Sequence, residues 1–138
     1  MPRTRIDRHA AVLAVAALFL ALGACSSGSS APAVSPLQRA IRRAAVTPAP
    51  AAITVADDVF VPKLIKVRAD SDITFTNTGH RLHDVIPVDG GGFRITTDEL
   101  RPGVSKTVRV AAPGTYRYFC SIHGTATSGM RGTIVVVR

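Results

Sequence analysis

Cysteine is scarce in this 138-residue sequence, which contains only Cys25 and Cys120. A binuclear metal centre is therefore disfavoured, since it would need a second thiolate close to Cys120. Basic residues are not interleaved with aromatic ones and no nucleic-acid-binding motif is present, so no nucleic-acid partner is expected. Residues 53–138 also lack a persuasive helical period. These absences leave a β-rich domain, residues 53–138, that contains a single cysteine, Cys120.

The sequence has no apolar run long enough to span a membrane comfortably, which takes about 20 residues. Its longest N-terminal run, Ala10–Leu22, covers 13 residues and follows Arg3, Arg5 and Arg8. A basic start, a short apolar run and small residues after it are typical of an export signal. We therefore predict that residues 1–24 are a signal peptide and that the protein leaves the cytoplasm.

The signal ends in Leu-Gly-Ala-Cys, residues 22–25, which resembles the lipobox of bacterial lipoproteins. The resemblance implies cleavage before Cys25 and attachment of lipid to its sulfur, with the protein held at the outer side of the cytoplasmic membrane. The alternative is ordinary secretory cleavage near Ala24, which leaves a free thiol. Residues 25–52, rich in Ser, Ala and Pro, are predicted to be a flexible linker of the kind an anchored domain needs.

One stretch of this linker, residues 37–46, is compatible with a short helix and carries Arg39, Arg42 and Arg43. These cations could lie against anionic lipid headgroups. The alternative is a solvated linker without that contact. Residues 53–138 hold 11 basic and eight acidic residues, so the domain itself is only mildly basic.

Strand-like alternation begins near Ile53 and continues through the rest of the chain. Residues 64–68, 73–76 and 104–110 alternate in whole or in part, and Ile134–Val137 is a continuous β-branched run. Such a run predicts a strand buried on both faces. Turn-forming clusters of Asp, Asn, Gly and Pro separate these segments. We predict that residues 53–138 form an all-β sandwich of two sheets, with about seven to eight strands and Greek-key connections.

Soft and borderline metal donors gather near the C-terminus. Cys120 and His123 are followed by Met130, and His83 lies upstream. Two imidazoles, a thiolate and a weak thioether form the donor set of a blue-copper electron-transfer site. Three of the four residues also have a simpler interpretation, with Cys120 and Met130 as buried core residues and His83 as a surface histidine.

Framework residues accompany these donors in a fixed order, from Phe60-Val-Pro62 through His83-Asp-Val85 to Pro113-Gly-Thr-Tyr116, Cys120-Ser-Ile-His123 and Gly129-Met-Arg-Gly132. The whole set resembles the cupredoxins of the plastocyanin type, over essentially all of residues 53–138. The resemblance implies one mononuclear type 1 copper, Cu(I)/Cu(II), bound by His83, Cys120, His123 and an axial Met130. Met130 is seven positions after His123, whereas plastocyanin-like chains usually place it about five after, so the loop around the metal is longer in this sequence.

The resemblance further implies a single-electron carrier between redox proteins and not an enzyme. We expect a monomer whose electron donor and acceptor the sequence does not identify. One alternative is a copper-binding or trafficking lipoprotein that uses the same ligands without electron shuttling. Another is an interaction module in which the site has no role.

Three neighbouring residues complete the prediction. Asp84 is expected to accept a backbone N–H and so to orient the ligands, a role often filled by Asn in the resembling proteins. Phe119 is expected to turn away from the core next to the Cys120 thiolate, where it forms either an electron path or ordinary strand packing. His80 could compete with His83 as a ligand, but its place in the turn favours an exposed position.

Overall fold

Eight strands form two four-stranded sheets in the computed structural model, which describes residues 33–138. The predicted signal peptide, Cys25 and the first part of the linker lie outside these described residues. The first sheet has the order β2-β1-β4-β6, with β2 at Val59–Val61, β1 at Ala51–Ala56, β4 at Asp72–Asn77 and β6 at Ser105–Arg109. The second has the order β3-β8-β7-β5, with β3 at Leu64–Arg68, β8 at Gly129–Val137, β7 at Gly114–Gly124 and β5 at Ile86–Pro87.

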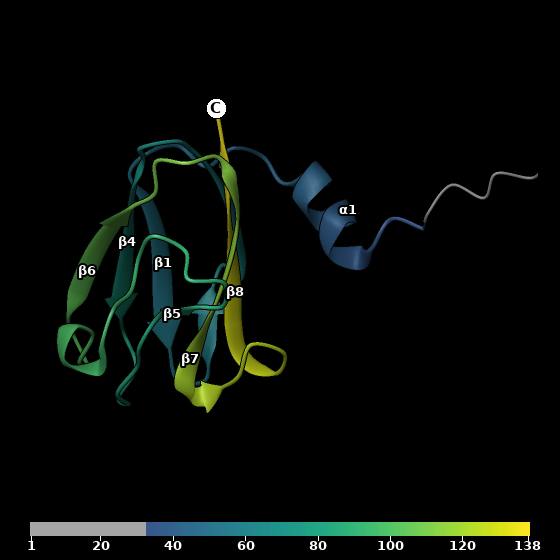
Figure 1. Cartoon of the computed structure of the whole chain (residues 1–138). Coiled ribbons are helices and arrows are strands. Elements are labelled where there is room, and N and C mark those ends of the chain that lie inside the picture. The colour runs from purple at the N-terminus through teal and green to yellow at the C-terminus, as the bar shows by residue number, and fades with distance from the viewer. Residues whose placement is uncertain (1–32) are drawn as a thin grey trace, which may run out of the picture. The chain divides into compact units, whose positions relative to one another are not determined.

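The two sheets are mixed, because β1 runs parallel to β4 and β3 runs parallel to β8, while the other pairs are antiparallel. Figure 1 shows the sheets facing each other as the two layers of a sandwich. The predicted all-β sandwich of about eight strands is thereby confirmed.

An aromatic cluster fills the space between the sheets. The ring of Tyr118 meets those of Phe60, Phe75 and Phe93 edge to face, with centroid separations of 4.9, 5.5 and 6.2 Å. Edge-to-face pairs are favourable beyond the area they bury, because the positive edge of one ring meets the negative face of another. Since Tyr118 comes from β7, this cluster fixes the strand that also carries Cys120.

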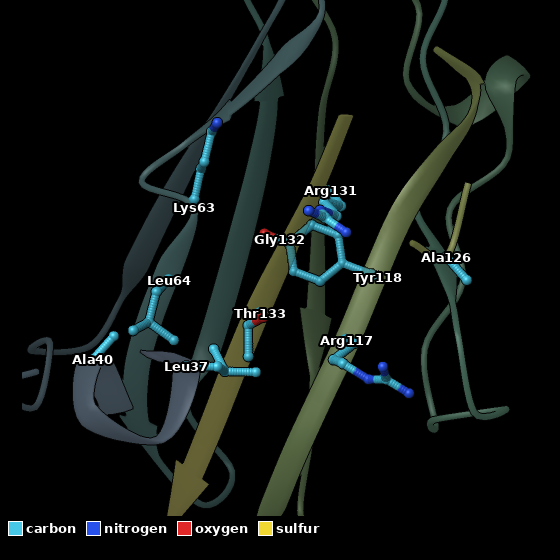
Figure 2. A pocket seen from close by; sticks show the side chains of 10 residues that line it. All are labelled: Leu37, Ala40, Lys63, Leu64, Arg117, Tyr118, Ala126, Arg131, Gly132 and Thr133. Carbon is cyan, nitrogen blue, oxygen red and sulfur yellow. The ribbon is translucent and has the colours of Figure 1, made fainter. Parts of the chain in front are cut away.

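Strand β8 is buried on both faces over the β-branched run, as predicted. It lies between β3 and β7, and Ile134 and Val136 point into the core. On the outer face, Leu64 and Thr133 line a cavity of about 390 Å³ together with Leu37 and Ala40 (Figure 2). None of the candidate metal ligands lines this cavity.

A single α-helix is present in the described part of the chain, α1 at Pro36–Arg43. It begins where the Ser35 hydroxyl accepts a hydrogen bond from the Gln38 backbone amide and the Gln38 side-chain oxygen accepts one from the Ser35 backbone amide, and Pro36 occupies the first turn. Such reciprocal capping stabilises a short helix. The helix-compatible segment of the linker is thus helical over most of its length. Within residues 33–138, no helix has the length and apolar character needed to cross a bilayer.

Strand β1 begins at Ala51, two residues before the start expected at Ile53. Ala51 and Ala52 pair with Ile73 and Thr74 of β4, and Ala51 is buried. The amide of Thr47 also donates to the Lys66 carbonyl. Backbone pairing with β4 therefore extends the strand into a segment whose prolines indicated a linker.

Candidate metal centre

Strand β7 carries both Cys120 and His123. In a regular strand, residues three apart point to opposite faces. The β7–β8 pairing shifts register between Phe119 and Gly124, which is an irregularity of the β-bulge type. Such a shift re-aims the side chains that follow it. His123 consequently turns back toward Cys120, and Ile122 points to solvent.

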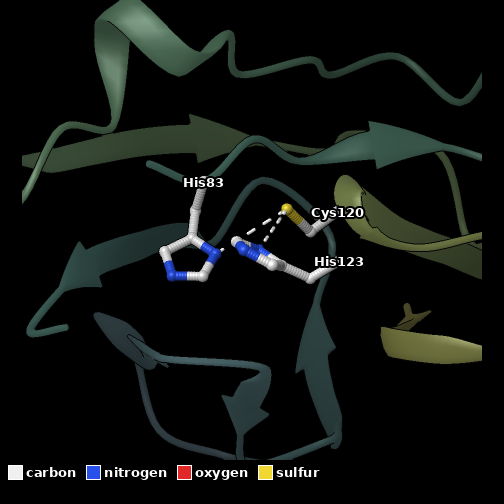
Figure 3. A group of neighbouring side chains, drawn as sticks. All are labelled: His83, Cys120 and His123. Carbon is white, nitrogen blue, oxygen red and sulfur yellow. Dashed lines mark hydrogen bonds between the residues drawn. The ribbon is translucent and has the colours of Figure 1, made fainter. Parts of the chain in front are cut away.

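His83 reaches the same point from the connection between β4 and β5, and it is fully buried. Its Nδ1 atom lies 3.7 Å from the Cys120 Sγ, and the Nδ1 of His123 lies 3.6 Å from that sulfur. The two imidazole rings are 4.8 Å apart between centroids. Figure 3 shows both rings directed at the thiol. The fold therefore brings His83 and Cys120, which are 37 positions apart in the sequence, into direct contact.

The separation of these donors fits a bound metal ion. A metal about 2.0 Å from an imidazole nitrogen and about 2.3 Å from a thiolate, with about 120° between the bonds, separates the two donors by about 3.7 Å. The two N···S distances match this value. All three ligand atoms lie within 4.8 Å of one another. The three side chains therefore form a possible copper site.

Burial sets the protonation of the ligands. It lowers the pKa of His83, and the charge of nearby His123 lowers it further, so His83 is held neutral with a lone pair to offer. Burial raises the pKa of the Cys120 thiol, and the hydrogen bonds it receives from backbone amides only partly oppose this. A metal ion must therefore displace a proton from Cys120 when it binds.

Asp84 ties the His83 connection to β7. One of its carboxylate oxygens accepts the Ser121 amide at 2.6 Å, and the other accepts the Ser121 hydroxyl. The expected backbone N–H bond is thus present, and it joins the residue after His83 to the residue after Cys120. Hydrogen bonds to neighbours of this kind hold metal ligands in orientation.

The other end of the His83 connection is fixed by the buried Asn77, the last residue of β4. Its side-chain amide donates to the carbonyls of Arg81 and Leu100, both at 2.9 Å, and its side-chain oxygen accepts the Gly79 amide. A buried amide that makes three hydrogen bonds is costly to disrupt. The segment that carries His83 is therefore anchored before and after the ligand.

Met130 is buried near the start of β8, and its backbone lies beside Gly124. A Cβ atom on Gly124 would lie 2.6 Å from the Met130 nitrogen, so glycine allows the two strands to approach here. Gly129 has φ of +72°, a conformation that favours glycine. Met130 therefore lies beside Gly124, the residue that follows His123, and its role as axial ligand stays a prediction.

The remaining sequence-predicted residues are at the edges of the site. The side chain of His80 is 97% exposed, in agreement with its expected place at the rim. Phe119 is half-buried and pairs with Ile86 and Arg131, while its neighbours Tyr118 and Cys120 are buried, so it does alternate away from the core.

Sequence reasoning missed the acidic turn between β1 and β2. Asp57 Oδ1 lies 3.7 Å from His83 Nε2, and Asp58 Oδ1 lies 4.0 Å from His123 Nε2. Burial raises the pKa of Asp57, but amide hydrogen bonds from Arg81 and His80 outweigh this and the pKa is lowered overall. A two-residue acidic turn is unremarkable as sequence, and only the folded loop after β4 brings it to the site.

Two apolar side chains flank the site at the surface. Leu82 and Ile122, which precede His83 and His123, are 51% and 50% exposed. The His123 side chain is 13% exposed, whereas that of His83 is covered completely. Any contact with a partner at this end of the molecule therefore reaches His123 before the other donors.

Comparison with known proteins gives one family. The Cupredoxin-like domain family matches residues 12–136. Amicyanin-alpha of Methylorubrum extorquens is 34% identical over 97 residues, an alignment that covers 67% of this chain and 78% of that protein. Plastocyanin of Vicia faba is 32% identical over 87 residues, with 56% of this chain and 86% of that protein covered.

Some relatives are much longer than the matched region. The chain spans about half the length of the chloroplastic plastocyanin of Pisum sativum, covering 51% of it at 32% identity. Among solved structures, a purple cupredoxin from Nitrosopumilus maritimus superposes with a TM-score of 0.53 at 21% identity, over 63% of this chain and 99% of that one. A copper-containing nitrite reductase from Thermus scotoductus gives 0.53 at 24% identity, over 68% of this chain but only 24% of that one. These two likenesses concern the fold alone.

Proposed function

This chain belongs to the cupredoxin-like family, and we propose that it is a type 1 copper protein that carries single electrons between redox proteins. The observation that carries the proposal is the convergence of two imidazole Nδ1 atoms on one buried thiol. Copper bound there would supply a one-electron change between Cu(I) and Cu(II), which soft thiolate and borderline imidazole donors together accommodate.

The protein's contribution is to hold the donors still. Asp84 fixes the segment after His83 to β7, and Asn77 fixes the segment before it. Ligands that are already in place need little rearrangement when the charge of the metal changes. His123, the more exposed imidazole, is the proposed point of electron entry and exit. Met130 is the proposed axial ligand.

The proposal includes no chemical conversion of a substrate. The likeness to nitrite reductase covers a quarter of that enzyme, at a level that concerns the fold alone. The alignments cover 86% of the Vicia faba plastocyanin and 78% of amicyanin-alpha, and this supports the proposal of a small electron carrier.

The test is to express residues 33–138, add Cu(II) and record the visible spectrum. We expect intense blue or green colour that a reductant bleaches reversibly. Met130→Leu should retain the colour and change the reduction potential, whereas Cys120→Ser should abolish the colour. A colourless protein would refute the electron-carrier proposal, and binding of Cu(I) alone would favour the copper-trafficking alternative.

We also propose that lipid on Cys25 holds the protein at the outer face of the cytoplasmic membrane. The support is the signal-like N-terminus and the short Ser-rich segment after Cys25. Two or more acyl chains anchor a protein stably, whereas one binds only marginally. Cell fractionation of the full chain and of Cys25→Ser tests this, because only the unsubstituted chain should sediment with membranes. Equal distribution of the two proteins would contradict lipid anchoring.

A further inference from the structure

The turn between β1 and β2 consists of only two residues, Asp57 and Asp58, because Ala56 pairs with Val59. Asp58 has φ of +65°, which Asp tolerates better than most residues. The turn directs one carboxylate toward the outer nitrogen of each imidazole. Asp57 Oδ1 is 3.7 Å from His83 Nε2, and Asp58 Oδ1 is 4.0 Å from His123 Nε2.

The Asp57 carboxylate is held firmly in this place. Its Oδ1 accepts the amide of His80 at 3.0 Å and the amide of Arg81 at 3.2 Å. A Cβ atom on Gly79 would overlap that same oxygen, so only glycine lets the loop fold so closely around it. The loop that delivers His83 is thus shaped around Asp57, and the carboxylate is not a freely rotating surface group.

His83 needs an acceptor at the position that Asp57 occupies. Its Nδ1 faces the thiol, so a neutral ring that offers the Nδ1 lone pair to a metal must carry its proton on Nε2. That nitrogen is buried and has no hydrogen-bond partner among residues 33–138. An N–H donor buried without an acceptor is costly. A carboxylate within 4 Å meets the need after a small approach to about 3 Å.

We propose that Asp57 is a positioning residue that accepts the Nε2–H of His83, fixing its tautomer and strengthening Nδ1 as a donor. Metal-bound histidines usually give their second N–H to a carboxylate, carbonyl or water, and losing that partner weakens metal binding about 10–100-fold. The inference rests on the metal site proposed above.

Asp58 has a weaker form of the same role. Its carboxylate is shared with the Arg81 guanidinium, at 3.1 and 3.2 Å, and it lies farther from its imidazole. It is also more exposed than Asp57, so solvent screens its charge more strongly. We therefore expect the effect of Asp58 to be smaller than that of Asp57.

The decisive variant is Asp57→Asn in the full chain, because asparagine keeps an oxygen for the His80 and Arg81 amides and removes the charge. We expect its Cu(II) affinity, measured by competition with a chelator, to fall about 10–100-fold. Its reduction potential should rise, since the oxidised ion loses an anionic neighbour. Asp58→Asn should change both quantities in the same direction by less.

The matched control is Asp72→Asn, which removes one carboxylate at the opposite end of β4, about 17 Å along the strand from Asn77. Asp72 pairs with Arg109 and not with a histidine. If Asp57→Asn changes affinity and potential no more than Asp72→Asn does, the inference is wrong.

The ¹⁵N chemical shifts of His83 in the metal-free full chain provide a second measurement. We expect the Nε2–H tautomer in the unsubstituted protein and a larger share of Nδ1–H in Asp57→Asn. If the unsubstituted protein stays colourless after copper is added, the proposed function is refuted, but the tautomer of His83 can still be measured in the metal-free chain. An unchanged tautomer in Asp57→Asn would overturn the inference even if copper binds.

Discussion

Tyr118 lies at the centre of the aromatic cluster, two residues before Cys120, and its ring is buried among Phe60, Phe75 and Phe93. Its hydroxyl has no hydrogen-bond partner in the part of the chain that the structure describes. Burial correspondingly raises the pKa of Tyr118 far above its usual value. Such a group reduces the stability of the core, because it loses contact with water and gains no bond.

We therefore predict that Tyr118→Phe leaves the free energy of unfolding unchanged or raises it by up to about 1 kcal/mol. Urea denaturation of the metal-free domain measures this. Gly132→Ala is the contrasting variant, because a Cβ atom at Gly132 would overlap the Tyr118 ring end. Overpacking of that kind should cost about 1–3 kcal/mol. A marked loss of stability in Tyr118→Phe would show that the hydroxyl has a bonding role.

The elements follow the sequence closely wherever alternation is regular. The inward positions of β3, β4 and β8 could be predicted because each strand keeps a period of two, or a β-branched run, between clear turns. The irregularity in β7 could not, since no composition signal marks where pairing with β8 shifts. Cys120 and His123 could still be predicted as ligands, because a thiol and an imidazole indicate metal binding whatever the local geometry of the strand.

Contacts between distant segments were harder to foresee than the ligands. Asp84 could be predicted as a support because it adjoins His83 and has a family counterpart. Asp57 could not, because its position beside His83 depends on Gly79 and the fold of the loop after β4. Likewise, pairing with β4 moved the start of β1 to Ala51.

The connection between β5 and β6 is fastened at Glu99, in the 3₁₀ turn η1 at Thr97–Glu99. Its carboxylate accepts from Lys106 at 2.7 Å and from the amide and hydroxyl of Thr96. These bonds lower the pKa of Glu99 from 4.5 to about 2, with the Lys106 hydrogen bond the largest cause. Leu100 next to it is fully buried and accepts from Asn77, so this turn supports the segment that carries His83.

We predict that Glu99 contributes to stability in a pH-dependent way. Because its pKa is lower in the folded state than in the unfolded state, its contribution is complete above about pH 5 and is lost as the pH falls toward 2. The thermal midpoint of Glu99→Gln should be lower than that of the unsubstituted domain at pH 6, and the difference should vanish near pH 2. Asp98→Asn, which alters a far more exposed carboxylate, is the control. A difference between Glu99→Gln and the unsubstituted domain that does not vary with pH would contradict this assignment.

At the scale of the whole domain, the candidate site joins parts of both sheets at one end of the sandwich. The acidic turn comes from the β1–β2 hairpin of the first sheet, and Cys120 and His123 come from β7 of the second. His83 lies on the connection that leads from one sheet to the other. Figure 1 shows the β7–β8 hairpin at this end of the molecule. A metal bound to all three ligands would therefore cross-link the connection between the sheets to β7.

We predict from this arrangement that copper raises the stability of the domain and that its removal lowers it. An ion that binds only the folded state adds about 4 kcal/mol when its concentration is a thousand times the dissociation constant. For a domain of about 100 residues this raises Tm by roughly 15–30 °C. Scanning calorimetry of the copper-loaded and chelator-treated domain measures the shift. Cys120→Ser should fold with a Tm close to that of the metal-free protein and should lose most of the gain. An equal gain in Cys120→Ser would place the stabilising ion at a different site.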